Sequence, residues 1–165
     1  MARLDIAEVH PHDHGHDIDV LNRLIKVTLD SAEGYREASR ESDDPGRKLA
    51  YGRLAEQRDS LVDILQQRAR DLGGLPAQEG SLLAKAHRAF MDIKHAFLRD
   101  DGTLDGSIRE GEAYLIDTWE VALNDPDLGE ATRAILQDAF DRIDPHPGDR
   151  ERHLLPPHDS FSPGL

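Results

Sequence analysis

The chain contains no cysteine, which excludes disulfide bonds, thiolate nucleophiles and metal sites built on cysteine. No apolar run approaches the roughly 20 residues that a membrane-spanning helix needs, and the first residues lack the apolar core of a secretory signal. Aromatic residues make up only 5% of the 165 residues, so a core must consist mainly of Leu, Ile, Val and Ala. These absences favour a single cytoplasmic domain that does not insert into a membrane.

Two sequence patterns of catalytic and metal sites are also missing. The sequence has no Glu-x-x-His pair, with which a di-iron helical bundle presents a carboxylate and an imidazole from one helix face. It also has no glycine-rich phosphate loop followed by Lys and Ser or Thr. The sequence therefore identifies no catalytic residue, and we expect a protein without a catalytic site.

Basic residues become scarce towards the C-terminus. The formal net charge is −13, and no lysine follows Lys94. A phosphate backbone would be repelled by this part of the chain, so we expect no nucleic-acid binding. The acidic residues either keep a helical surface soluble or attract cations or a basic partner.

The residues that are present predict an all-α protein. Apolar positions recur at helical spacing, and Asp, Pro and Gly separate the segments. Asp17 or Asp19 is expected to cap the first helix, Asp44-Pro45 to begin the second, and Gly73-Gly74 to end it. The predicted helices span 18–43, 45–72, 81–98, 104–124 and 127–143. Residues 1–17 are expected to form a polar arm, 18–144 the helical domain, and 145–165 a proline-rich flexible tail.

Several strings resemble a known family. VLNRLI at 20–25, AEGYREA at 32–38, AFMDIKHAF at 89–97 and GEAYLIDTWEVAL at 111–123 resemble an uncharacterised bacterial family of ferritin-like four-helix bundles of unknown function. The resemblance implies a ferritin-like bundle, with the segment 81–98 as an additional amphipathic crossover helix. By analogy alone, it also implies a metal-binding ancestry.

Helical wheels place one carboxylate and one arginine on inward faces, taking about 100° per residue. Glu112 lies among Ile108, Leu115 and Trp119, and Arg58 lies in the apolar stripe of the second helix. A buried carboxylate is costly unless it has a partner, and a guanidinium can meet it with two parallel hydrogen bonds. We therefore predict a buried pair of Glu112 and Arg58, which the hydroxyls of Tyr35 and Tyr51 could join.

The alternative is a metal site around Glu112. Glu33 and Asp59 are the nearest candidates for further carboxylate ligands, although Glu33 lies far from the apolar stripe and Asp59 lies at its margin. A di-iron centre needs about four carboxylates and two histidines. The sequence therefore offers at most a degenerate ferritin-like site, with iron as its candidate metal.

The N-terminal segment offers a second possible metal site. His10, His12, His14 and His16 alternate with other residues, and an extended chain would bring the four imidazoles to one side. Such a cluster suits nickel, zinc or copper. The same segment is also typical of a solvated polar arm.

Two functional classes follow from these patterns. The first is a structural or interaction protein, which we expect to act as a homo-oligomer. The second is a metal-handling protein that uses either the Glu112 region or the histidine arm.

Overall fold

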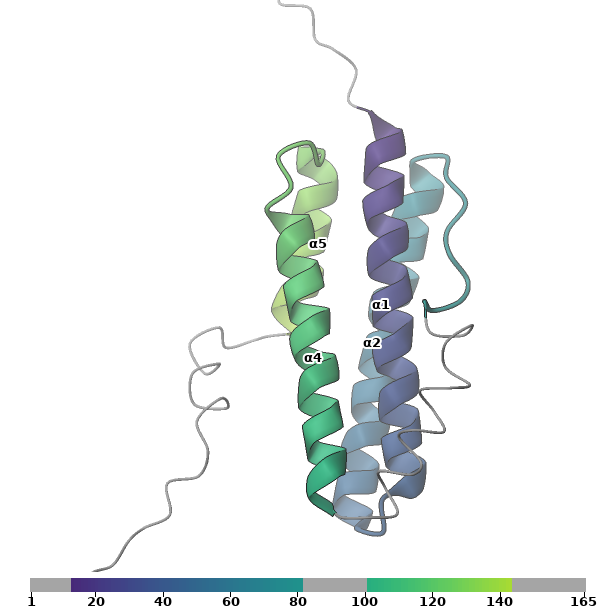
Figure 1. The fold of residues 1–165 in the computed structure, drawn as a ribbon. Helices are drawn as coiled ribbons and strands as arrows, with labels where there is room; N and C mark the ends of the chain where they lie inside the picture. The colour runs from purple at the N-terminus through teal and green to yellow at the C-terminus, as the bar shows by residue number, and fades with distance from the viewer. Residues whose placement is uncertain (1–12, 82–100, 144–165) are drawn as a thin grey trace, which may run out of the picture.

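The computed structural model describes residues 13–81 and 101–143, and within these ranges the protein is a bundle of four helices without strands (Figure 1). The helices are α1 (His14–Glu41), α2 (Pro45–Asp71), α4 (Asp101–Leu123) and α5 (Glu130–Ile143). Helices α1 and α2 form a long hairpin, α4 packs along α1, and the shorter α5 packs against α4 and α2. The predicted all-α class and bundle are confirmed. No helix within the described ranges is long and apolar enough to cross a membrane.

Helix α1 begins at His14 instead of residue 18. Asp13 is its N-cap, and the carboxylate of Asp13 accepts a hydrogen bond from the backbone N–H of Gly15. The expectation that Asp17 or Asp19 caps this helix is therefore wrong. Asp17 lies inside the first turn and is buried.

The ends of α2 follow the sequence prediction. Asp44 caps the helix by accepting a hydrogen bond from Arg47 N–H, and Pro45 occupies the first turn, where its missing N–H costs nothing. Gly73 has a φ of +82°, which favours glycine, and Gly74 N–H bonds back to the carbonyl of Ala69.

Two other helices begin at different residues from those predicted. Helix α4 begins at Asp101 instead of residue 104, and α5 begins at Glu130 instead of residue 127. The later start of α5 has a local cause, because Asp125 accepts a hydrogen bond from Asp127 N–H within the turn. The predicted helix 81–98, apart from Ser81, and the predicted tail lie outside the described residues.

The core is mainly aliphatic and contains one large aromatic pair. Trp119 is fully buried, stacks on Phe140 at 6.1 Å between ring centroids, and donates from its indole nitrogen to Thr28. The same hydrophobic core contains leucine, isoleucine, valine and alanine side chains from the four described helices. The buried polar or charged residues in the described ranges are Asp17, Thr28, Arg58 and Thr132.

A buried arginine–carboxylate cluster as the candidate functional site

Arg58 projects from α2 into the bundle, where its side chain is only 1% exposed. Its Nε donates to the hydroxyl of Ser31 at 3.3 Å, and its two terminal nitrogens donate to Gln57 and Glu112, each at 2.8 Å. Every nitrogen of the guanidinium therefore has a hydrogen-bond partner. These hydrogen bonds offset the free-energy cost of removing the cation from water.

Glu112 reaches the same point from α4. Its Oε2 accepts from Arg58, its Oε1 accepts from the hydroxyl of Ser31 at 3.2 Å, and its side chain is 24% exposed. Ser31 belongs to α1, so the cluster joins three helices. The structure thus brings together the two residues predicted as an internal pair, and Ser31 links them.

Two tyrosines border this cluster. The guanidinium carbon of Arg58 lies 5.7 Å from the centre of the Tyr35 ring, which stacks on Tyr51 at 6.1 Å. Burial raises the pKa of the Tyr35 phenol above its ordinary value, and the nearby carboxylate of Glu112 raises it further. Tyr35 is therefore a neutral hydroxyl at physiological pH.

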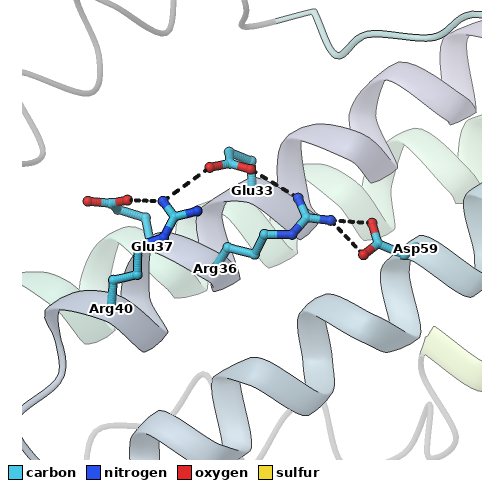
Figure 2. Close-up of polar contacts among 5 residues, drawn as sticks. All are labelled: Glu33, Arg36, Glu37, Arg40 and Asp59. Atoms are coloured by element: carbon cyan, nitrogen blue, oxygen red, sulfur yellow. Dashed lines mark hydrogen bonds and ion pairs between the residues drawn. The ribbon is translucent and has the colours of Figure 1, made fainter.

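The other two carboxylates of the alternative metal site lie on the surface (Figure 2). Arg36 donates to Glu33 at 3.0 Å and to both carboxylate oxygens of Asp59, and Arg40 joins Glu33 to Glu37. The hydrogen bonds to Asp59 and Glu33 raise the pKa of Arg36. Glu33 and Asp59 thus both bind Arg36, whereas Glu112 binds Arg58.

These placements bear on the proposed metal ligands. Across residues 13–81 and 101–143, no three His, Asp or Glu side chains gather in a group that could hold a metal ion. In the same ranges, every buried side-chain nitrogen and oxygen has a hydrogen-bond partner. Each of the three carboxylates considered as metal ligands, Glu33, Asp59 and Glu112, accepts hydrogen bonds from an arginine.

Two of the four histidines of the predicted cluster, His14 and His16, lie within the described residues. His14 and His16 lie in the first turn of α1, where a separation of two residues corresponds to roughly 200° of rotation. The extended spacing expected for them is therefore wrong, because the Asp13 cap begins the helix there. The ring nitrogen Nε2 of His16 lies 2.9 Å from the carboxylate of Asp125. His10 and His12 lie outside the described residues.

A second buried polar group was missed by the sequence analysis. Asp17 accepts hydrogen bonds from the backbone N–H of Gly129 at 3.0 Å and from the hydroxyl of Thr132. Arg68 donates to the same hydroxyl at 3.0 Å. Asp17 thus places a carboxylate at the N-terminus of α5, where the helix dipole favours negative charge.

One sequence signal pointed to Asp17. It stands four residues before Leu21 on the buried face of α1, so its spacing alone marks it as inward. Its partners could not be found in this way, because Gly129 and Thr132 lie more than a hundred residues along the chain.

The comparison with known proteins identifies the family alone. No curated protein and no solved structure matches the chain. A family model described as a domain of unknown function, DUF2383, matches residues 16–125, which include all but the first two residues of α1, the whole of α2 and α4, and the Arg58–Glu112 cluster. Because this match spans more than half of the sequence, the chain belongs to the DUF2383 family.

Proposed function

We propose that this protein is a non-catalytic, ferritin-like helical bundle that acts as a homo-oligomer in a structural or interaction role. The observation that carries the proposal is the pairing of Glu112 with Arg58. In a metal-binding bundle, inward carboxylates converge on a cation. Here the guanidinium of Arg58 supplies that positive charge, and its hydrogen bonds join three helices.

The surface of α4 supports the interaction role. Tyr114 is 66% exposed and Val121 is 65% exposed, although both are large apolar residues. They stand two helical turns apart, so they share one face of α4. We propose that this face packs against the same face of a second copy, because a two-fold axis makes one patch serve both partners.

Metal analysis tests the non-metal part of the proposal. Protein purified without a nickel column is expected to contain no stoichiometric iron, zinc or nickel. Glu112→Ala is then expected to lower the free energy of unfolding and to leave the metal content unaltered. Stoichiometric metal that disappears in Glu112→Ala would instead establish Glu112 as a ligand.

Sedimentation analysis tests the oligomeric part. The native chain is expected to sediment as an oligomer, and the double substitution Tyr114→Ser with Val121→Ser is expected to shift it to the 18.4 kDa monomer. Leu75→Ser is the matched control, because Leu75 is also exposed but lies in the loop after α2. A native chain that is monomeric at every concentration would refute the homo-oligomer.

One observation favours metal binding at the N-terminus as a second candidate function. His16 is hydrogen-bonded to Asp125, and metal-bound histidines commonly use their second ring nitrogen in this way. Calorimetric titration with nickel and zinc tests this candidate. Removal of residues 1–12, which keeps the Asp13 cap, and His14→Ala should each weaken binding. Undiminished binding in both variants would exclude the histidine segment.

A further inference from the structure

Helix α5 covers only one half of α2 (Figure 1). Near the start of α5, Arg68 of α2 donates to Thr132, and near its end Gln57 of α2 donates to the carbonyl oxygen of Arg142. Because α5 contains 14 residues and α2 contains 27, α2 continues for about three turns beyond the end of α5. This remaining half of α2 contains no buried residue before Ala55.

The uncovered half of α2 presents apolar side chains. Residues 45–50 are all exposed, and Leu49 is 57% exposed although it is a large apolar residue. Ala50 and Leu54 stand seven and three residues before Gln57, so they continue the side of α2 that contacts α5. The side of α2 that α5 covers therefore extends beyond the end of α5.

The same half of α2 is basic, in a chain whose net charge is −13. The segment 45–55 contains Arg47, Lys48 and Arg53 and has no acidic residue. We call residues 47–54 the basic surface of α2. A segment that combines apolar and acidic side chains would be complementary to it.

The residues that follow α5 in the sequence have this composition. Because α5 runs antiparallel to α2, its last residue, Ile143, lies near the point where the basic surface begins. Residues 144–165 contain four acidic residues against two arginines, and the apolar pair Leu154-Leu155. An extended chain spans roughly 3.3 Å per residue and a helix rises about 1.5 Å, so this segment is long enough to reach the whole basic surface.

We propose that residues 144–165 dock on the basic surface of α2, with Leu154 and Leu155 against its three apolar residues. Docking removes apolar side chains of both segments from water and brings acidic residues close to Arg47 and Arg53. The inference goes beyond the proposed function, because it concerns a contact within one chain and does not use the exposed face of α4.

Disulfide formation within full-length variants tests the docking. The natural chain has no cysteine, so Ala50→Cys and His153→Cys supply a single pair. Oxidation at low protein concentration is expected to close this disulfide within one chain. Closure should be several-fold slower when Leu154→Ser and Leu155→Ser are added, because the two leucines hold the segment on α2. Non-reducing gel electrophoresis at a series of times measures the rate.

A second cysteine position is the matched control. Lys48 is also exposed, but it stands two residues before Ala50 and so lies roughly 200° around the helix. With Lys48→Cys in place of Ala50→Cys, the two serine substitutions should leave the rate of closure unchanged.

Charge reversal tests the electrostatic part. Arg53→Glu is expected to slow closure between Ala50→Cys and His153→Cys, because it places an acidic residue opposite an acidic segment. Arg70→Glu makes the same change at the other end of α2, where Arg70 is also exposed, and should have no effect on closure.

The outcomes separate docking from chance contact. Equal closure with and without the two leucines would overturn the proposal, as would equal effects of Arg53→Glu and Arg70→Glu. A disulfide that forms only between chains would mean that a second copy's segment occupies the surface, and would also reject the proposal. If the serine variant does not fold by circular dichroism, the comparison of Arg53→Glu with Arg70→Glu decides. Sedimentation of the native chain tests the homo-oligomer separately, so either proposal can fail without the other.

Discussion

Arg58 and Glu112 are bound to each other so closely that neither is expected to tolerate loss of the other. Glu112→Ala leaves the buried guanidinium without its anion. It should lower the free energy of unfolding by about 3 kcal/mol, the low end of the range for buried pairs because Glu112 is partly exposed. Urea denaturation followed by circular dichroism measures this loss.

The double replacement distinguishes a coupled pair from two independent residues. Arg58→Met with Glu112→Leu removes both charges and keeps similar volumes, so it should recover much of the stability lost in Glu112→Ala. If the loss of stability in the double variant equals the sum of the losses in the two single variants, the pairing is contradicted.

Tyr35 makes stability depend on pH in the alkaline range. Its folded pKa lies above the ordinary value of 10.0, because burial and Glu112 disfavour the phenolate. Above that ordinary value the unfolded phenol loses its proton and the folded one keeps it, so the free energy of unfolding should fall as pH rises. Tyr35→Phe should reduce this dependence, and an unchanged pH profile would show that Tyr35 is not its source. Urea midpoints at a series of alkaline pH values measure it.

The sequence predicted individual inward residues better than their partners. Helical spacing was sufficient to place Arg58 and Glu112 on inward faces, because a 3.6-residue period fixes direction within one helix. Helical spacing could not predict that Ser31 is hydrogen-bonded to both residues, or that Arg36 binds both Glu33 and Asp59. Such contacts depend on how helices dock, which local periodicity does not encode.

At the scale of single helices, the start of α1 depends on Asp13. Asp13→Ala removes the side-chain acceptor of Gly15 N–H and should destabilise the protein by about 1 kcal/mol. Asp19→Ala is the matched control, because Asp19 is exposed and within the helix, and it should change stability little. Thermal unfolding of the two variants compares them. If Asp19→Ala loses more stability than Asp13→Ala, Asp19 caps the helix, as the sequence suggested.

The docking of α5 can be followed through the single tryptophan of the chain. Phe140→Ala removes the ring that stacks on Trp119 and should cost about 3 kcal/mol, as for other buried phenylalanines. The fluorescence of Trp119 should shift to longer wavelength as water approaches its ring. Gln137→Ala, on the exposed side of α5, should leave both the emission and the stability unchanged. Unshifted emission in Phe140→Ala would contradict the stacking.

Helix boundaries were predictable where one capping residue stands alone in the sequence, and mispredicted where several aspartates compete for the same role. Asp44, Pro45 and Gly73 act on neighbouring backbone groups, so their positions were readable from the sequence. The first helix was misplaced because three aspartates stand close together. Asp13, Asp17 and Asp19 are all suitable caps by residue type. The structure separates them, because Asp13 accepts the hydrogen bond from Gly15 N–H whereas Asp17 packs against the start of α5.

For the molecule as a whole, the net charge of −13 opposes compaction. Added sodium chloride screens this repulsion, so the midpoint of thermal unfolding should rise between low and moderate salt. The exposed pairs around Arg36 and Arg40 should weaken this rise only slightly, because such pairs contribute about 0–1 kcal/mol each. Differential scanning calorimetry across a salt series measures the effect. A falling midpoint would mean that attractive pairs outweigh the net repulsion.

The contact between Asp17 and the start of α5 also orders events during synthesis. Residue 17 leaves the ribosome long before its partners Gly129 and Thr132, because synthesis proceeds from the N-terminus at roughly 5–20 residues per second. The α1–α2 hairpin can therefore assemble while the carboxylate of Asp17 is still hydrated. That carboxylate loses its water only when α5, the last described helix, docks. The packing of α1, the first helix to be synthesised, is therefore completed only by the last.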